Sequence, residues 1–246
     1  MRIHRIFTDQ ELQPGHTVHL PEATAHYLSR VLRVTVGQRV LVFNGDGHDY
    51  AADIERLGRG ELGLQLQTRL PAAAESPRAI TLVQAISRGE RMDISIQKAT
   101  ELGVTSIQPV FSARCEVKLK AEKLQRRVEH WRRVAISACE QSGRARLPEL
   151  KEPVDLWAWL EQQTPAVRLA LLPGAEHSLA RVAEGVDGSS GFDLLIGPEG
   201  GFDEQEVALL ERAGVRAVHL GPRVLRTETA GPAAIAVIQA VAGDLA

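Results

Sequence analysis

The sequence lacks any long hydrophobic run. No apolar stretch in its 246 residues approaches the roughly 20 residues that a membrane-spanning helix needs. The opening residues 1–5 also lack the continuous apolar segment of a signal peptide. We therefore expect a cytoplasmic protein with no membrane among its partners.

Cysteine and aromatic residues are scarce. Cys115 and Cys139 are the two cysteines and belong to no Cys-x-x-Cys pair, which argues against a disulfide framework and a zinc ribbon. We expect both to be buried, reduced thiols. Aromatic residues make up only 4% of the chain, so the core must consist mainly of Leu, Val, Ile and Ala.

Several signatures of familiar chemistry are also missing. The eight histidines show no His-x-x-x-His spacing, so no metal site is predicted. The absence of a Gly-x-Ser-x-Gly elbow argues against a serine hydrolase. Residues 85–89, after a predicted strand, contain no glycine fingerprint, which removes the main support for a dinucleotide-dependent oxidoreductase.

Positive and negative charges nearly balance over the whole chain but are unevenly distributed along it. The chain has 29 basic and 31 acidic residues and a net charge of −2. Residues 1–70 have a net charge of 0, residues 71–150 of +5, and residues 151–246 of −7. A basic middle third can serve a polyanion, although charge alone favours the simpler interpretation of solvated helix faces.

The first seventy residues have the pattern of a small β-barrel or sandwich. Residues 38–43 and 50–57 resemble strands, and the turn residues 44–47 between them predict a hairpin. In residues 61–67, leucine alternates strictly with polar residues or glycine, which is typical of a strand with one wet face. We expect one helix inserted near 21–33.

Beyond a linker at 71–77, rich in proline and alanine, short apolar strands alternate with helices. This order predicts an α/β domain, residues 78–246, with a parallel sheet flanked by helices. Each long helix is followed by a glycine suited to a helix C-cap, at Gly103, Gly143 and Gly214. The predicted strands are 80–85, 106–110, 168–172, 193–196 and 217–220, and the predicted helices are 90–102, 119–142 and 203–213.

The second of these helices is amphipathic. An apolar stripe follows one of its faces, and several basic side chains lie largely off that stripe. The stripe consists of Leu124, Val128, Trp131, Ala135 and Ala138, and the basic residues are Lys123, Arg126, Arg127 and Arg133.

Two loops after predicted strands are candidates for a binding site, because ligands of such folds bind at the carboxyl ends of strands. The first, 197–202, has three glycines before a capping-box pair, Asp203 and Glu206. A tight turn explains the glycines equally well, but Glu199 within the turn indicates a partner. The second, 220–230, contains two arginines, a glutamate and two threonines; its alternative is a capped helix with Thr227 or Thr229 as N-cap.

Two further features concern surfaces. The final helix, 231–241, is apolar almost all round, so we expect it to be buried on more than one side, against its own sheet and a second protomer. His26, Arg30 and Arg33 are spaced along one helix face and, with Arg2 and Arg5, suggest a phosphate-contacting surface. A plain solvated face remains the simpler interpretation of that spacing.

Four motifs in order resemble the RsmE family of the SPOUT superfamily. They are residues 98–104, 138–144, 196–201 and 220–230, and the resemblance covers essentially the whole chain. It implies an S-adenosylmethionine-dependent enzyme that methylates N3 of a uridine in 16S ribosomal RNA of the small subunit, releases S-adenosylhomocysteine and uses no metal. It also implies a PUA-like RNA-binding barrel at 1–70, a deep trefoil knot in the α/β domain, and a homodimer.

The resemblance maps functional residues onto this chain. From the chemistry of N3 methylation, we expect Arg226 to stabilise negative charge on the uracil, and Glu228 or Glu199 to take its proton or merely hold loop backbone groups. The implied cofactor site comprises Leu172, Ile196, Gly197, Pro198, Glu199, Gly200, Gly201, Leu220, Gly221, Val224, Leu225, Arg226, Thr229 and Ala230. We expect an RNA track of Arg2, Arg5, His26, Arg30, Arg33, Arg88, Arg91, Lys98 and Arg144. The alternatives are a non-catalytic RNA-binding protein of the same fold and a methyltransferase for another RNA base.

Overall fold

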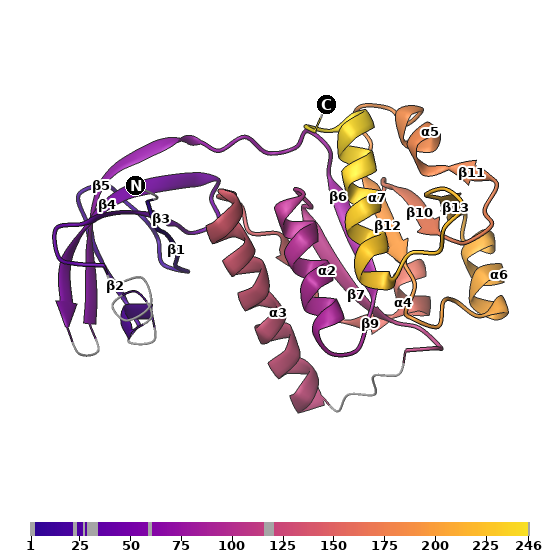
Figure 1. Cartoon of the computed structure of the whole chain (residues 1–246), viewed down its shortest axis with the longest axis horizontal. Coiled ribbons are helices and arrows are strands. Elements are labelled where there is room, and N and C mark those ends of the chain that lie inside the picture. The colour runs from indigo at the N-terminus through magenta and orange to yellow at the C-terminus, as the bar shows by residue number, and fades with distance from the viewer. Residues whose placement is uncertain are drawn as a thin grey trace. The chain divides into compact units, whose positions relative to one another are not determined.

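The chain divides into two compact units in the computed structural model (Figure 1). The structure describes residues 3–21, 24–26, 28, 34–58, 61–115 and 121–245. The first unit comprises Met1–Ala74 and Cys139–Leu147, and the second comprises Glu75–Ala138 and Pro148–Ala246. Within the described ranges, no helix has both the length and the apolar character needed to cross a membrane.

The first unit contains a five-stranded mixed sheet with the order β1-β3-β4-β5-β2. β1 pairs parallel with β3, and the other neighbours pair antiparallel. The predicted hairpin is confirmed: β3 and β4 are joined by residues 44–47, where Gly45 and Gly47 have φ angles of 94° and 96° that favour glycine. The strands are β1 (Arg5–Phe7), β2 (Thr17–Leu20), β3 (Arg39–Phe43), β4 (His48–Gly58) and β5 (Glu61–Ala72).

The alternating pattern of β5 produces the core of this unit. Leu62, Leu64 and Leu66 are fully buried and pack with aliphatic side chains from all the other strands. The strand period of two places these three side chains on the same face, as the sequence predicted. Of the predicted helix 21–33, the described residues 24–26 and 28 are helical, and residues 22, 23, 27 and 29–33 lie outside the described residues.

A distant segment completes the first unit. Cys139 and Ala145 are fully buried against Phe43, and the backbone N–H of Gly47 donates to the Ala145 carbonyl at 3.2 Å. The predicted division into 1–70, 71–77 and 78–246 did not include this return of residues 139–147. Both cysteines are reduced thiols. Cys139 is buried, as predicted, whereas Cys115 is only half-buried.

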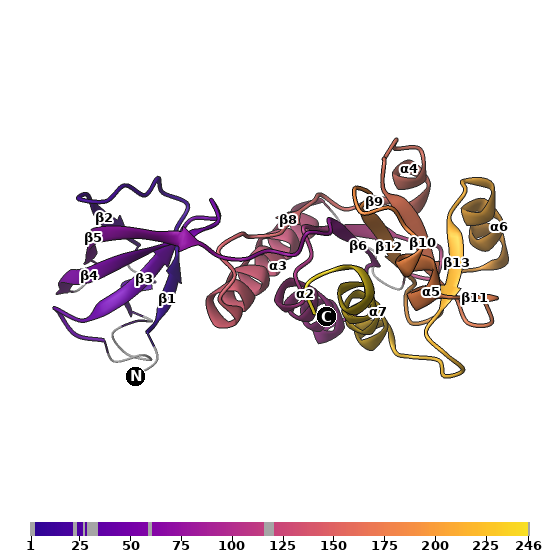
Figure 2. The same ribbon diagram turned by 90° about the horizontal axis from the view of Figure 1, so that it is seen from above.

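The second unit is a parallel sheet with helices on both faces, as predicted. Its order is β11-β13-β10-β12-β6-β7-β8, with β9 pairing with β7, and every pair is parallel. Figure 2 shows α2 and α7 on one side of the sheet and α4 and α6 on the other. The strands are β6 (Ile80–Ala85), β7 (Ser106–Phe111), β8 (Glu149–Leu150), β9 (Val154–Asp155), β10 (Val167–Leu171), β11 (His177–Ser178), β12 (Phe192–Ile196) and β13 (Arg216–His219).

The helices of this unit also follow the sequence pattern. Gly103, Gly143 and Gly214 have φ angles of 86°, 91° and 73°, so each takes the left-handed conformation expected after a helix. The helices are α2 (Glu90–Glu101), α3 (Ala121–Ser142), α4 (Leu156–Leu160), α5 (Leu179–Glu184), α6 (Glu204–Arg212) and α7 (Thr227–Ala242).

Helix α7 is buried on several sides. It packs between α2 and α5 and lies on β6 and β12. Near its end, the buried amide of Gln239 donates to the Leu102 carbonyl at 2.8 Å and accepts from the Ser76 hydroxyl at 2.6 Å. Arg78, which is 8% exposed, donates to the Ala242 carbonyl at 2.9 Å and to carbonyls of residues 186, 187 and 190 after α5. One guanidinium therefore joins the ends of two helices.

We predict that Arg78→Met lowers the free energy of unfolding of the second unit by about 2–4 kcal/mol, because four backbone carbonyls lose their donor. Denaturation in urea, followed by tryptophan fluorescence, measures the change. Arg181→Met, which removes an exposed arginine of α5, should change the free energy by less than about 0.5 kcal/mol. Equal stability of the two variants would contradict a structural role for Arg78.

Candidate active site

A cavity of about 410 Å³ lies at the carboxyl ends of β10, β12 and β13. This is the edge at which parallel sheets of this kind bind ligands. Its walls come from residues 171–173 after β10, 196–202 after β12 and 219–226 after β13, with Arg91 of α2 and the first turn of α7 completing it. The two loops predicted from the sequence therefore meet in one pocket.

The loop after β12 is held in a tight conformation. A Cβ atom on Gly197 would lie 3.1 Å from the Phe202 ring, and Gly201 has a φ of 67°, so both positions suit glycine. The predicted capping box is confirmed at the start of α6. Asp203 accepts from the backbone N–H of Glu206 at 2.8 Å, and the Glu206 carboxylate accepts from the backbone N–H of Asp203 at 3.0 Å.

A buried hydroxyl fastens α7 to this loop. The Thr227 hydroxyl donates to the Gly197 carbonyl at 2.8 Å and accepts from the Gln84 amide at 2.9 Å. The N-cap of α7 is Arg226, with extended backbone and no side-chain cap. The prediction of Thr227 or Thr229 as N-cap is therefore wrong, because Thr227 is already helical and its hydroxyl is used by a neighbouring strand.

One end of the pocket is charged. Glu199 accepts from the Arg91 guanidinium at 2.8 Å and from the backbone N–H of Arg88 at 3.2 Å. The pKa of the Glu199 carboxyl is lowered overall. Burial raises this pKa, but hydrogen bonds from its own backbone, from Arg91 and from Arg88, together with the charge of Arg91, lower it by more. Glu199 is therefore a stable anion and a weak proton acceptor.

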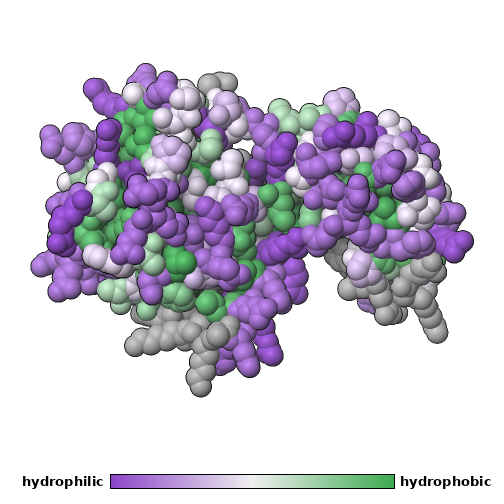
Figure 3. Space-filling model, turned by 180° about the vertical axis from the view of Figure 1, so that it is seen from behind, coloured by the Kyte–Doolittle hydropathy of each residue, from purple (hydrophilic) through white to green (hydrophobic). Residues whose placement is uncertain are grey.

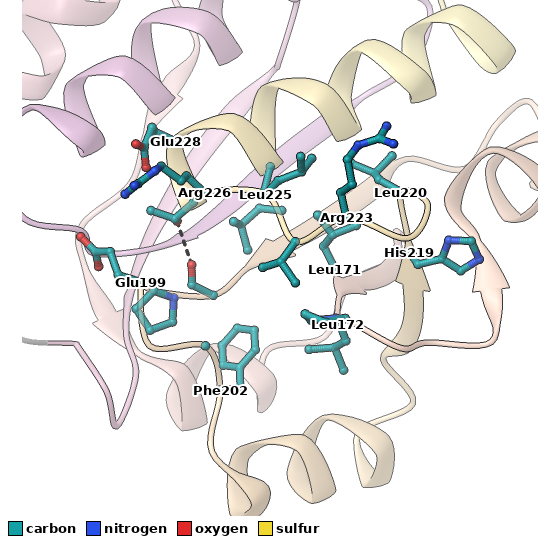
Figure 4. A pocket seen from close by; sticks show the side chains of 18 of the residues that line it. Leu171, Leu172, Glu199, Phe202, His219, Leu220, Arg223, Leu225, Arg226 and Glu228 are labelled. Carbon is teal, nitrogen blue, oxygen red and sulfur yellow. Dashed lines mark hydrogen bonds between the residues drawn. The ribbon is translucent and has the colours of Figure 1, made fainter.

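Glu228 differs from Glu199 in its surroundings. Its nearest cation is Arg91, whose Nε lies 3.9 Å from Oε1. Its Oε2 is buried and has no hydrogen-bond partner within the described part of the chain. Figure 4 shows Glu199, Arg226 and Glu228 toward one end of the pocket, with Leu171, Leu172 and Leu225 in its middle. A buried, unpaired carboxylate oxygen at a pocket costs free energy unless a ligand donates to it.

The structure places most of the predicted cofactor residues along the pocket. Gly200 and Thr229 do not line it; the Gly200 carbonyl accepts from Arg114 at 2.8 Å instead. In the described ranges, no group of three His, Cys, Asp or Glu side chains is placed to hold a metal. Eight lining residues were not predicted to bind the cofactor: Arg91, Leu171, Pro173, Phe202, His219, Arg223, Thr227 and Glu228. Most of them are neighbours in sequence of residues that were predicted, and this proximity could have identified them.

Two members of the predicted RNA track are structural instead. Arg5 is 9% exposed in its side chain, pairs with Asp49 at 2.7 Å, and donates to the carbonyls of Cys139 and Arg144. Its guanidinium also lies 4.5 Å from the centre of the Phe43 ring. Arg144 is itself buried, at 9% exposure. The prediction that these two arginines contact phosphate is corrected, because neither presents its charge to solvent.

The remaining members of that track differ in exposure and in partners. Lys98 pairs with Glu101 at 2.9 Å within α2, and Arg91 is engaged by Glu199. Arg88 and His26 are exposed. Arg2, Arg30 and Arg33 lie outside the described residues, so that part of the prediction stays a prediction.

We predict that Arg91→Gln raises the pKa of Glu199, because it removes a hydrogen bond and a positive charge. A carboxyl whose pKa is lowered by folding adds to the free energy of unfolding at every pH above its unfolded-state pKa. This contribution is lost as the pH falls through the folded-state pKa. NMR titration of the carboxyl carbon of the Glu199 side chain measures the shift. Lys98→Gln, which breaks the Lys98–Glu101 pair, is the control and should leave the Glu199 pKa unchanged.

Comparison with known proteins identifies relatives over the whole chain. Residues 74–239 match the RNA methyltransferase domain family, and residues 20–67 match the RNA methyltransferase PUA domain family. A Ribosomal RNA small subunit methyltransferase E of Buchnera aphidicola is 34% identical over 99% of this chain and 98% of its own. One from Synechocystis is 33% identical over 92% of this chain and 73% of its own.

Solved structures agree with this. A Neisseria gonorrhoeae Ribosomal RNA small subunit methyltransferase E bound to S-adenosylmethionine has a TM-score of 0.91 and 36% identity, and covers all of both chains. A Legionella pneumophila structure with the same bound cofactor has a TM-score of 0.94 and 38% identity, and covers 99% of this chain and 100% of its own. The chain belongs to the RNA methyltransferase family, with a PUA domain and a methyltransferase domain, that includes Ribosomal RNA small subunit methyltransferase E.

Proposed function

We propose that the protein transfers a methyl group from S-adenosylmethionine to N3 of a uridine in 16S ribosomal RNA of the small subunit. The single observation that carries this proposal is the pocket at the strand ends, which combines glycine-rich backbone and apolar walls with the unpaired Oε2 of Glu228. The relatives with this name, and the cofactor bound in two similar structures, support it.

The residues of the pocket fit the cofactor. Leu171, Leu172 and Leu225 offer apolar surface to an adenine ring. The backbone of loops 196–202 and 219–226 offers donors and acceptors to the edge of that ring, which side chains at the glycines would obstruct. The bound cofactor supplies a methyl group on a positively charged sulfur.

The residues at the charged end would prepare the uracil. Its N3 carries a proton, and the N3 lone pair becomes a good nucleophile as that proton leaves. Glu228, whose Oε2 is unpaired, accepts the proton in this proposal, whereas Glu199 keeps Arg91 in place. Arg226 is exposed at the pocket and stabilises the negative charge that spreads to the uracil carbonyls.

The finer features of the architecture belong to the same proposal. The first unit would close as a PUA-like barrel that binds RNA, and α7 would pass through a loop to make a deep trefoil knot. The strand order supports this, because the chain runs from β13 past β10 to place α7 on β12 and β6. A homodimer would bury the side of α7 that exposes Val241, and the cytoplasm would be the site of action.

Incubating the purified protein and labelled S-adenosylmethionine with unmodified small subunits, and separately with naked RNA, tests the activity. Mass spectrometric mapping should find a methyl group at N3 of one uridine. A methyl group on another base would overturn the uridine assignment while leaving the enzyme class. Failure to bind S-adenosylhomocysteine in calorimetry would instead favour a non-catalytic RNA-binding protein.

We predict that Glu228→Gln lowers the turnover number by about 10²–10⁴-fold at saturating substrates, because it removes the proton acceptor while keeping the shape. The loss should be smaller at high pH, where the N3 proton leaves unaided. Glu184→Gln, an exposed position of α5, is the control and should retain full turnover. A loss confined to cofactor affinity would show that Glu228 holds the cofactor instead.

Arg226→Ala should lower the turnover number by about 10²–10³-fold, because a donor to the developing oxyanion is lost. Methyl transfer is measured with saturating cofactor and RNA. Near-normal turnover together with weakened RNA binding would instead assign Arg226 to holding the substrate.

A further inference from the structure

Helix α3 carries a set of basic side chains that the proposed site does not use. The set consists of Lys123, Arg126, Arg127 and Arg133. The spacing is three residues from 123 to 126, four from 123 to 127 and seven from 126 to 133, which places all of them along one side of the helix. We call this set the basic face of α3. We propose that the basic face of α3 binds the phosphate backbone of the RNA that flanks the target nucleotide.

The packing of α3 determines where this face points. Within the apolar stripe, Trp131, Ala135 and Ala138 are each 1% exposed, and Leu124 and Val128 are half-buried. The helical period then directs the opposite side toward solvent. Lys123, Arg126 and Arg133 are exposed and Arg127 is half-buried, as this orientation requires. Figure 3 shows one surface of the molecule, where hydrophilic side chains predominate around smaller apolar groups.

The charges of this face are available to a ligand. Within the described part of the chain, Lys123, Arg126 and Arg127 have no ion pair or side-chain hydrogen bond. The Arg133 guanidinium contacts only the Glu129 carbonyl of its own helix, at 3.4 Å. Residues 121–133 contain five basic and two acidic residues. Lys123, Arg126 and Arg127 therefore keep positive charges that no described acidic side chain pairs with.

The basic face lies beside α2, a helix that also contributes one residue to the pocket. His130, on the same side of α3, contacts the Asp93 carboxylate at 2.7 Å. Asp93 is in the first turn of α2, two residues after Arg91, which lines the pocket. In this proposal, the backbone that flanks a base in the pocket extends past α2 to α3. Bases that undergo chemistry must leave their stack, so the flanking backbone needs such a support.

The chemistry of the face favours phosphate over other anionic ligands. Residues 123–133 span about 15 Å along the helix axis, which is long enough for several successive phosphates. Flexible lysine and arginine side chains at such spacing contact backbone charge without reading bases. This inference rests on the proposed function, because that function supplies the polyanion.

The test uses the full chain with Lys123→Gln, Arg126→Gln and Arg133→Gln combined. Glutamine keeps helix propensity close to that of lysine and arginine. Binding of unmodified small-subunit ribosomal RNA is measured over a range of salt concentrations. The slope of log affinity against log salt should become less steep by about 2, since three contacts to single-stranded phosphate are lost. The Michaelis constant for RNA should rise while turnover at saturating RNA and cofactor affinity stay unchanged.

A matched control removes three exposed cations elsewhere in the same unit, with Arg181→Gln, Arg212→Gln and Arg216→Gln combined. An equal loss of slope in this control, or an unchanged slope in the α3 variant, would overturn the proposal. So would normal binding of naked RNA with lost binding of assembled subunits, which would indicate a ribosomal protein as partner. If the parent chain neither binds nor methylates the RNA, the proposed function fails instead.

Discussion

The pocket depends on the buried hydroxyl of Thr227. This hydroxyl bonds at once to the carbonyl that follows β12 and to an amide at the end of β6. Because β13 lies two strands away from β12 in the sheet, the chain between β13 and α7 must cross the end of β10 to reach this anchor. The crossing segment becomes one wall of the cavity, and the anchored turn of α7 places Glu228 in it.

Three arginines of this protein satisfy backbone carbonyls. Arg5, Arg78 and Arg168 are all nearly buried, and each donates to two or more carbonyl oxygens. Such carbonyls at helix ends and loops otherwise lack donors. The net charge of a segment is therefore a weak guide to where a polyanion binds. The charges of the basic face of α3 are mostly exposed and that of Arg5 is paired, and this difference depends on partners that only the folded structure reveals.

The sequence predicted local features well and distant partners poorly. The strand starting at Ile80 and the capping box at Asp203 were predictable because apolar runs and cap residues act over a few positions. The pocket loops were predictable since three glycines next to a carboxylate are unusual in a simple turn. The role of Arg5 was not, because its partner Asp49 is 44 positions away. The return of residues 139–147 to the first unit was missed for the same reason.

The order of elements along the chain has a consequence for biosynthesis. All strands of the second unit precede α7, yet the cavity is closed only when α7 docks through Thr227 and Gln239. A nascent chain that stops short of Thr227 would contain the whole sheet without a complete cavity. Competence to bind a ligand in this cavity thus requires the last helix of the chain.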